Sequence, residues 1–170
     1  SQTEFESFRR IAQTAERGLF SAFFLGEGLR LREHLGKIHD NDVAGRPDGI
    51  TQLAALAPIT EKIGLVATQN TTYNEPADLA YRLASLDLLS EGRAAWNIVT
   101  TDNAWTGANF RRGGHLAHEH RYDRAAEFVR AAKELWANRG GVDFDGEFIR
   151  FVSERVLPQS PQSRPVLFQA

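Results

Sequence analysis

The sequence predicts an α/β fold in which helices cover a parallel β-sheet. Helical and strand periodicities alternate along its 170 residues, and each predicted strand is apolar throughout, as strands buried on both faces are. Polar segments containing Gly, Asn and Thr follow the strands, at the carboxyl edge of the sheet. An open doubly wound sheet and part of a (β/α)8 barrel both fit this pattern, and both bind their ligands at that edge.

The chain opens with a predicted helix over residues 3–17, where apolar residues recur at spacings of three and four. Thr3 is the expected N-cap and Gly18 the expected stop. The continuous apolar run 19–25 follows directly and predicts a strand buried on both faces. Residues 29–48 are polar and rich in Gly, His and Asp, so we expect a loop there.

A second helix and strand follow over residues 50–68. The helical spacing of 50–62 includes Pro58, which predicts a kink or an early stop because proline lacks the N–H that a helix needs. Residues 63–68 predict another buried strand. The next helix opens with a favourable Glu-Pro pair before its inward stripe, which comprises Leu79, Leu83, Leu86 and Leu89.

The last third of the chain predicts one more helix between two strands. Residues 93–100 predict a strand, 120–137 a helix, and the run from Val166 a fourth buried strand. The inward stripe of this helix comprises Ala125, Phe128, Ala132 and Leu135. Near 142–153, alternating phenylalanines flank an Asp-Gly turn, which predicts a small hairpin outside the main repeat.

The composition is that of a globular protein and argues against several classes. Twenty Lys and Arg against 22 Asp and Glu leave a net charge of −2, which gives no indication of a nucleic-acid partner. There is no cysteine for a disulfide or a thiolate metal site, and no apolar run is long enough for a membrane span. We expect a single domain over residues 1–170, in a cytoplasmic protein without a membrane partner.

Common nucleotide-binding and hydrolase motifs are missing. The Gly26 to Gly28 segment lacks the third glycine of a dinucleotide-binding loop, because Leu31 takes its place. The sequence contains neither a GxxxxGK[ST] phosphate loop nor a GxSxG nucleophile motif. These observations argue against dinucleotide-binding, nucleotide-hydrolase and serine-hydrolase hypotheses.

A histidine cluster precedes the last predicted helix. His115, His118 and His120 lie within six residues, and three interpretations stay open: a metal site, one capping histidine with two solvated ones, or an anion site. The spacing matches no zinc signature. Basic residues outnumber acidic ones between 111 and 133, and the exposed amides of a helix start favour a phosphate.

Six segments together carry a more specific signal: Thr68–Pro76, Ala84–Arg93, Trp96–Thr100, Asn109–Phe110, His118–Ala125 and Pro158–Gln162. In this order they resemble the bacterial luciferase-like flavin monooxygenases, in the branch of nitrilotriacetate monooxygenase component A and dibenzothiophene-sulfone monooxygenase. The resemblance implies a (β/α)8 TIM barrel, of which this chain supplies about strands 2 to 5 with their helices. Members of this family are much longer than 170 residues. The present sequence contains no methionine and ends within an apolar run. We therefore expect a piece of a longer protein.

The resemblance also implies a site for flavin mononucleotide (FMN). It makes Thr68 a flavin contact and directs Asn97 toward the isoalloxazine ring or the substrate. His118 and Tyr122, four residues apart, match the family pair that holds the ribityl phosphate portion. Glu27 stands where relatives commonly have aspartate, so its carboxylate reaches one methylene further. We expect no catalytic side chain and no metal ligand among these residues.

The function implied by the resemblance is that of a two-component monooxygenase, an oxidoreductase. Reduced FMN would come from a separate NAD(P)H:flavin reductase, and the cofactor would perform the oxygen chemistry on a small organic substrate. The strand-end loops 28–48 and 102–117 would select the substrate, in a homo-oligomeric protein. We expect the 170 residues by themselves to be inactive. Two alternatives are a non-catalytic flavin-binding barrel and an unrelated half-barrel aldolase or isomerase.

Overall fold

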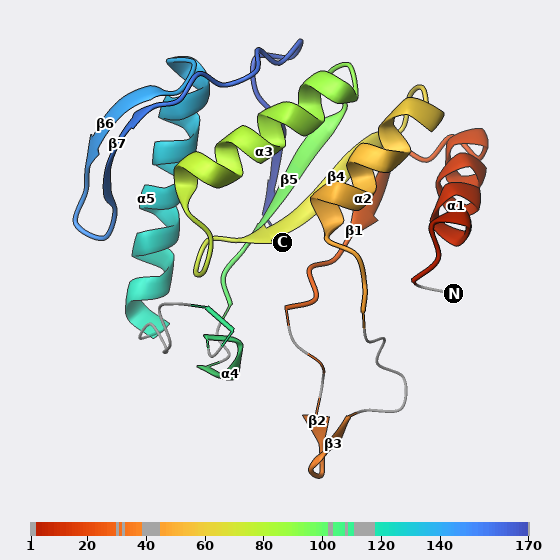
Figure 1. Ribbon diagram of the computed structural model, residues 1–170, viewed down its shortest axis with the longest axis horizontal. Coiled ribbons are helices and arrows are strands. Elements are labelled where there is room, and N and C mark those ends of the chain that lie inside the picture. Colours follow the sequence, from red (N-terminus) through yellow and green to blue (C-terminus); the bar gives the residue numbers. More distant parts are fainter. Residues whose placement is uncertain are drawn as a thin grey trace.

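The computed structural model describes residues 3–29, 31, 33–38, 45–101, 104–107, 109–110 and 118–169. Four parallel strands form the main sheet: β1 (Ala22–Leu25), β4 (Gly64–Asn70), β5 (Ala94–Val99) and β8 (Val166–Gln169). The helices are α1 (Phe5–Arg17), α2 (Gly49–Leu56), α3 (Pro76–Leu89), α4 (Ala104–Gly107) and α5 (His118–Ala137). Two antiparallel hairpins lie outside the sheet: β2 (Glu33–His34) with β3 (Lys37–Ile38), and β6 (Gly141–Asp145) with β7 (Arg150–Glu154) (Figure 1).

The order of the strands distinguishes between the two architectures that fit the sequence. β1, β4, β5 and β8 are neighbours in the order in which they occur along the chain. Right-handed crossovers between such successive neighbours place every connecting helix on the same face of the sheet. A doubly wound sheet instead reverses its strand order and carries helices on both faces. The sheet is therefore an arc of a (β/α)8 barrel, which confirms the predicted fold class.

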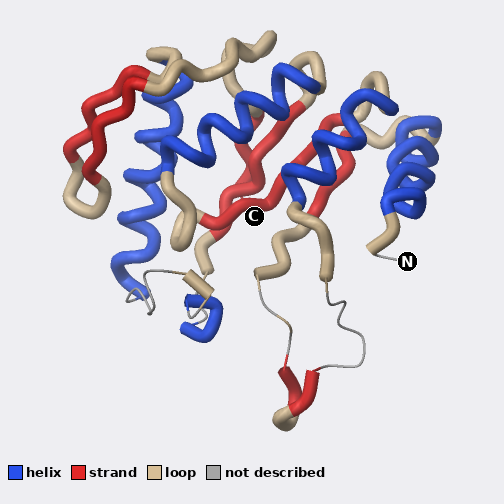
Figure 2. Tube along the Cα trace, viewed as in Figure 1, coloured by secondary structure: helices blue, strands red, loops and turns tan. Residues whose placement is uncertain are grey.

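The helices form one layer beside the sheet, with α1, α2, α3 and α5 in sequence order (Figure 2). Trp96 of β5 is fully buried in the core between the two layers. Its ring centroid lies 5.9 Å from that of Phe128 and 6.4 Å from that of Trp136, both on α5. The indole N–H donates to the backbone oxygen of Gln69 at 3.0 Å, so its polar atom is satisfied. This side chain thus joins two strands to α5.

The second face of the sheet carries the alternate residues of the same strands. Side chains alternate between the faces of a strand, and Val66 and Ala95 are buried but lie outside the helix-facing core cluster. The register pairs Val66 with Ala95 and, nearer the carboxyl ends, Thr68 with Asn97. The second face therefore changes from apolar to polar toward the carboxyl edge.

The opposite, amino edge of the sheet is held together by a buried carboxylate. Asp87 of α3 accepts hydrogen bonds from the Ala94 N–H at 2.9 Å, from Gln162 Nε2 at 2.6 Å and from the Ser160 hydroxyl. Gln162 also donates to the Ala94 carbonyl at 2.9 Å. These bonds attach the segment before β8 to the start of β5.

The structure confirms most of the predicted elements. α2 ends at Leu56 and Pro58 lies in the 3₁₀ turn that follows, which is the early stop that a proline imposes. Pro76 is the first residue of α3, and the hairpin near 142–153 is β6–β7. The predicted stripe of α5 is buried, with exposed fractions from 0% to 9%.

Several predictions of burial were wrong. Leu19 has a φ of 60° and is 89% exposed, so β1 starts later than predicted, and β1 is only partly buried. Val166 and Phe168 of β8 are about half exposed. β1 and β8 are the outer strands of the described sheet, so each has one strand neighbour instead of two. In α3, the buried stripe stops before Leu89, its last residue, which is 62% exposed.

Three local details also differ from the predictions. Glu4, and not Thr3, is the N-cap of α1, and it makes no side-chain capping bond. The short β2–β3 hairpin lies inside the predicted loop 29–48, and α4 lies between β5 and α5. In the described part of the chain, no helix combines the length and the apolar character that a membrane span needs.

Candidate functional site

The carboxyl ends of the parallel strands share one edge of the sheet. The β2–β3 hairpin, α4 and the first turn of α5 lie on this side of the molecule, the lower side in Figure 1. Ligands of parallel α/β folds bind at this edge, because the strand-end loops converge there. The residues predicted to bind the cofactor come from β4, β5, the segment after β1 and the first turns of α5.

Thr68 and Asn97 lie side by side on the second face of the sheet. They are register partners across β4 and β5, and they are 7% and 4% exposed. Asn97 Nδ2 donates to Thr68 Oγ1 at 3.2 Å, whereas the buried Asn97 Oδ1 has no hydrogen-bond partner among the described residues. The Thr68 hydroxyl can donate or accept, so a rotated amide would leave the nitrogen unpartnered instead. In either orientation, one buried polar atom of Asn97 therefore lacks a hydrogen-bond partner among the described residues.

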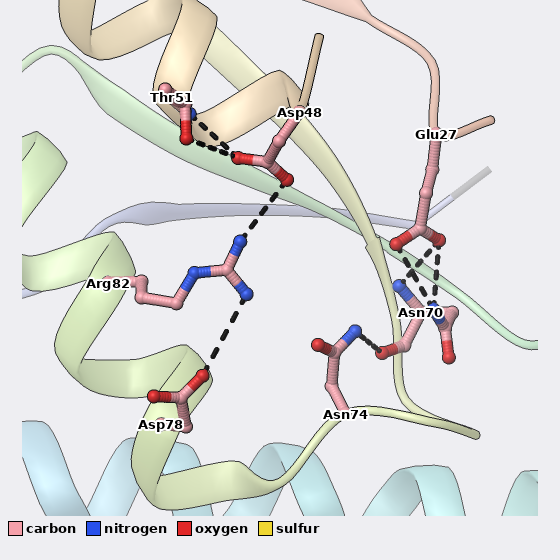
Figure 3. Close-up of polar contacts among 7 residues, drawn as sticks. All are labelled: Glu27, Asp48, Thr51, Asn70, Asn74, Asp78 and Arg82. Atoms are coloured by element: carbon pink, nitrogen blue, oxygen red, sulfur yellow. Dashed lines mark hydrogen bonds and ion pairs between the residues drawn. The ribbon is translucent and has the colours of Figure 1, made fainter. Parts of the chain in front are cut away.

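Glu27 follows β1 and binds the neighbouring strand (Figure 3). Its carboxylate accepts the backbone N–H of Asn70 at 3.0 Å and the Asn70 Nδ2 group at 3.0 and 3.1 Å. Asn70 Oδ1 in turn accepts the Tyr73 N–H at 2.7 Å, which fixes the orientation of the Asn70 amide. Glu27 thus connects the end of β1 with the end of β4.

Burial raises the pKa of Glu27 from 4.5 to about 7, although the hydrogen bonds from Asn70 oppose the shift. The charge of Asp48 raises this pKa further and that of Arg82 lowers it. Arg82 pairs with Asp48 at 3.2 Å and lies 3.9 Å from Asp78 (Figure 3), so much of the nearby charge is balanced. Glu27 can therefore exchange a proton near neutral pH.

Tyr122 of α5 lines a cavity of about 830 Å³ between α5 and the ends of β5 and β8. Val99, Thr100 and Phe168 also line this cavity, and Tyr122 itself is 55% exposed, which leaves room for a ligand beside its ring. His118 is the first residue of α5, but its side chain lies outside the described residues. The pairing of His118 with Tyr122 stays a prediction.

The basic stretch over residues 111–133 is divided between different roles. Its first part, up to residue 117, lies outside the described residues. Arg124 is 5% exposed, donates from Nη1 to the backbone oxygen of Thr71 and lies 5.9 Å from the ring centroid of Phe128. The Arg130 guanidinium lies 5.0 Å from the ring centroid of Phe144. Two of the basic side chains thus make packing contacts, which a count of charges does not show.

The histidine cluster gives no metal site in the described part of the chain. His115 lies outside it, and the ring centroid of His120 is 5.7 Å from that of Phe148, next to the β6–β7 hairpin. Among the described residues, no three His, Asp or Glu side chains are arranged to hold a metal ion.

Two contacts at this edge do not follow from the sequence: that of Asn70 with Glu27 and that of Arg124, a member of the basic stretch, with Thr71. Asn70 lies inside one of the quoted segments, but nothing in the sequence indicates that it binds Glu27. For Arg124 there was a signal of burial, because it precedes Phe128, Ala131 and Leu135 at spacings of three and four. These residues are almost fully buried, so the inner face of α5 continues to Arg124.

Comparisons with known proteins point in one direction. The family described as Luciferase-like monooxygenase matches residues 1–170. The chain is 40% identical to N-acetyl-S-(2-succino)cysteine monooxygenase of Bacillus subtilis (strain 168), over 96% of this chain and 41% of that protein. It is 37% identical to nitrilotriacetate monooxygenase component A of Aminobacter aminovorans, over 99% of this chain and 43% of that protein.

A solved structure extends the similarity to the fold. It is a riboflavin lyase crystallised with modified FMN and riboflavin, with a TM-score of 0.86 and 31% identity over 98% of this chain and 43% of that chain. The chain thus spans about two fifths of the length of the relatives that it matches.

Proposed function

Because the chain belongs to the luciferase-like monooxygenase family, we propose that it forms part of the oxygenase component of an FMN-dependent two-component monooxygenase. Such a component receives reduced FMN from a separate reductase and uses O2 to oxidise a small organic substrate. When bound, the reduced flavin supplies the reactivity toward oxygen, and the protein supplies binding, orientation and exclusion of water.

The observation that carries this proposal is the buried, unpartnered polar atom of Asn97 beside Thr68. A polar atom that stays buried without a partner costs on the order of 1–3 kcal/mol, so a ligand that completes its hydrogen bonds gains binding energy there. The isoalloxazine ring has alternating N–H and carbonyl groups along one edge and can match either orientation of the amide. Thr68 and Asn97 would therefore hold the ring at the carboxyl edge of the sheet.

We assign the other predicted residues to different parts of the cofactor. Tyr122 lines the cavity along the side of α5 and lies near the amino end of this helix, where backbone N–H groups and the helix dipole favour a phosphate. We place the phosphate end of FMN there, with His118 as the second contact of the pair. Glu27 lies at the strand-end edge bound to Asn70, so it would shape the site from the β1 side.

Three further features belong to this proposal. An NAD(P)H:flavin reductase would be the partner that supplies reduced FMN, and the oxygenase would be a homo-oligomer. Because the reaction would need the reductase and a reduced nicotinamide cofactor, we place it in the cytoplasm. The substrate would be a small organic molecule selected by the loops that follow the strands.

The proposal is tested by anaerobic titration with reduced FMN, followed by flavin fluorescence and absorbance. We expect saturable one-to-one binding to the wild-type protein. Asn97→Ala should weaken it by roughly 1–3 kcal/mol, because the hydrogen bond to the ring is lost. Asn138→Ala, an exposed asparagine at the far end of α5, is the control and should bind as the wild type does. A wild-type protein that binds no flavin in either redox state would contradict the proposal.

A further inference from the structure

At the carboxyl edge of the sheet, the connection between β4 and α3, residues 71–75, contacts several neighbouring elements. Both of its threonines bind the end of β5: the Thr71 N–H donates to the Val99 carbonyl at 2.9 Å, and Thr72 Oγ1 accepts the Thr101 N–H at 3.1 Å. Thr71 and Thr72 are 1% and 7% exposed. We call these residues the β4–α3 connection.

The connection is also fixed from the β1 side and from the segment after α4. Asn70, directly before it, accepts the Tyr73 N–H and donates to Glu27. The ring of Tyr73 stacks on that of Phe110 with centroids 4.6 Å apart and an angle of 7° between the planes. These contacts leave the β4–α3 connection little freedom to move relative to β1 and β5.

Arg124 attaches α5 to this connection. Its guanidinium donates to the Thr71 carbonyl and lies over the ring of Phe128, one helical turn further along α5. Burying a guanidinium is costly unless its donors are satisfied, and a surface arginine would avoid this cost. Arg124 is 5% exposed and donates to the Thr71 carbonyl, so it connects the early turns of α5 to the strand ends.

The position of this bond matters because the proposed cofactor site has two halves. Thr68 lies on β4, three residues before Thr71, and Tyr122 lies on α5, two residues before Arg124. The ring of FMN would bind the strand ends and its phosphate would bind the start of α5. Both contacts contribute fully to the binding energy only when the distance between the strand ends and the start of α5 is held constant.

We propose that Arg124 is a positioning residue that sets the separation between the ring-binding and the phosphate-binding halves of the FMN site. This inference rests on the proposed function, since it concerns the same site. It predicts that Arg124 contributes to the binding of FMN but hardly to the binding of riboflavin, which has the same ring and no phosphate.

The test compares the dissociation constants of FMN and riboflavin for the wild-type protein and its variants. Arg124→Met keeps the apolar stem and removes the donors, so we expect FMN to bind about tenfold more weakly and riboflavin less than about twofold more weakly. Arg124→Lys retains a donor for the Thr71 carbonyl and should recover part of the FMN affinity. Arg155→Met is the matched control. The guanidinium carbon of Arg155 also lies over an aromatic ring, 3.4 Å from the ring centroid of Tyr81.

Hydrogen exchange of the ligand-free Arg124→Met protein is the second measurement. A positioning role requires faster exchange than in the wild type over residues 70–74 and 120–128, before any ligand is added. Weaker FMN binding with unchanged exchange would make Arg124 a direct phosphate ligand and would overturn the inference. An equal loss of affinity for both flavins, or no loss for either, would also overturn it. If the wild type binds neither flavin, the proposed function itself fails.

Discussion

Glu27 is a partly buried acid whose ionisation works against the folded state. The folded protein holds this proton more tightly than the unfolded chain does, because burial raises its pKa from 4.5 to about 7. The free energy of unfolding must therefore decrease as the pH rises through this interval, and the contribution of the neutral acid is present in full only below it. Glu27 thus makes the carboxyl edge of the sheet less stable at neutral and alkaline pH.

Replacing Glu27 with glutamine should remove this pH dependence. We expect Glu27→Gln to be more stable than the wild type at pH 8, by up to about 3 kcal/mol, and similar to it near pH 4.5. Urea unfolding of both proteins at the two pH values measures the difference. Glu154→Gln, an exposed glutamate of β7, is the control. A pH-independent difference between Glu27→Gln and the wild type would show that Glu27 is not the titrating group.

The end of α5 depends on a glycine that no other residue can replace without strain. Gly140 has a φ of 97°, and its N–H donates to the Leu135 carbonyl at 2.7 Å to close the helix. A Cβ at this position would overlap the backbone carbonyl of Arg155. The neighbouring Arg139 carbonyl accepts the Leu157 N–H at 3.0 Å, so the segment after β7 cannot easily move away.

Gly140→Ala should therefore destabilise the protein by at least about 2 kcal/mol, because the backbone strain adds to the overlap. Gly141→Ala is a matched control: the nearest heavy atom to its Cβ would be the Asn138 oxygen at 3.9 Å, an ordinary contact. Thermal and urea unfolding compare the two variants. If both lost the same stability, the close approach of Arg155 to Gly140 would not be a feature of the folded protein.

Helices and strands with a clear hydrophobic period could be predicted from the sequence, whereas the contacts between them could not. The stripe from Leu79 to Leu86 is buried as its helical spacing indicates, because one helix face packs on one sheet. The bond between Glu27 and Asn70 depends on the register of β1 against β4, which neither strand's own sequence contains. The exposure of β8 likewise depends on how many neighbours a strand has, which an apolar run does not indicate.

At the scale of the whole molecule, the two inner strands differ from the two outer ones. β4 and β5 have strand partners on both sides in the described sheet, while β1 and β8 have one partner each. Phe24 and Phe168, on the outer strands, are each about half exposed. The stability of the sheet should therefore decrease from its centre toward both outer strands.

Native-state hydrogen exchange of the 170-residue chain, followed by mass spectrometry, should show this difference. We expect the amides of β4 and β5 to exchange most slowly and those of β1 and β8 at least about tenfold faster, because only the inner strands open through global unfolding. The amides of α3, which connects β4 to β5 along the chain, should exchange as slowly as those of the inner strands. Equal protection of all four strands would mean that further chain segments or a second molecule pair with the outer edges.

The successive order of the strands also affects how the chain folds. Of the three parallel pairings, that of Leu65 with Ala94 joins residues that are nearest in sequence, and that of Ala95 with Val166 closes the longest loop. Closing a short loop loses the least chain entropy, so β4, α3 and β5 should assemble first and serve as the nucleus on which β1 and β8 add. Thr68, Asn97 and the β4–α3 connection all belong to this unit. The ring-binding half of the proposed cofactor site is then also the part that forms earliest.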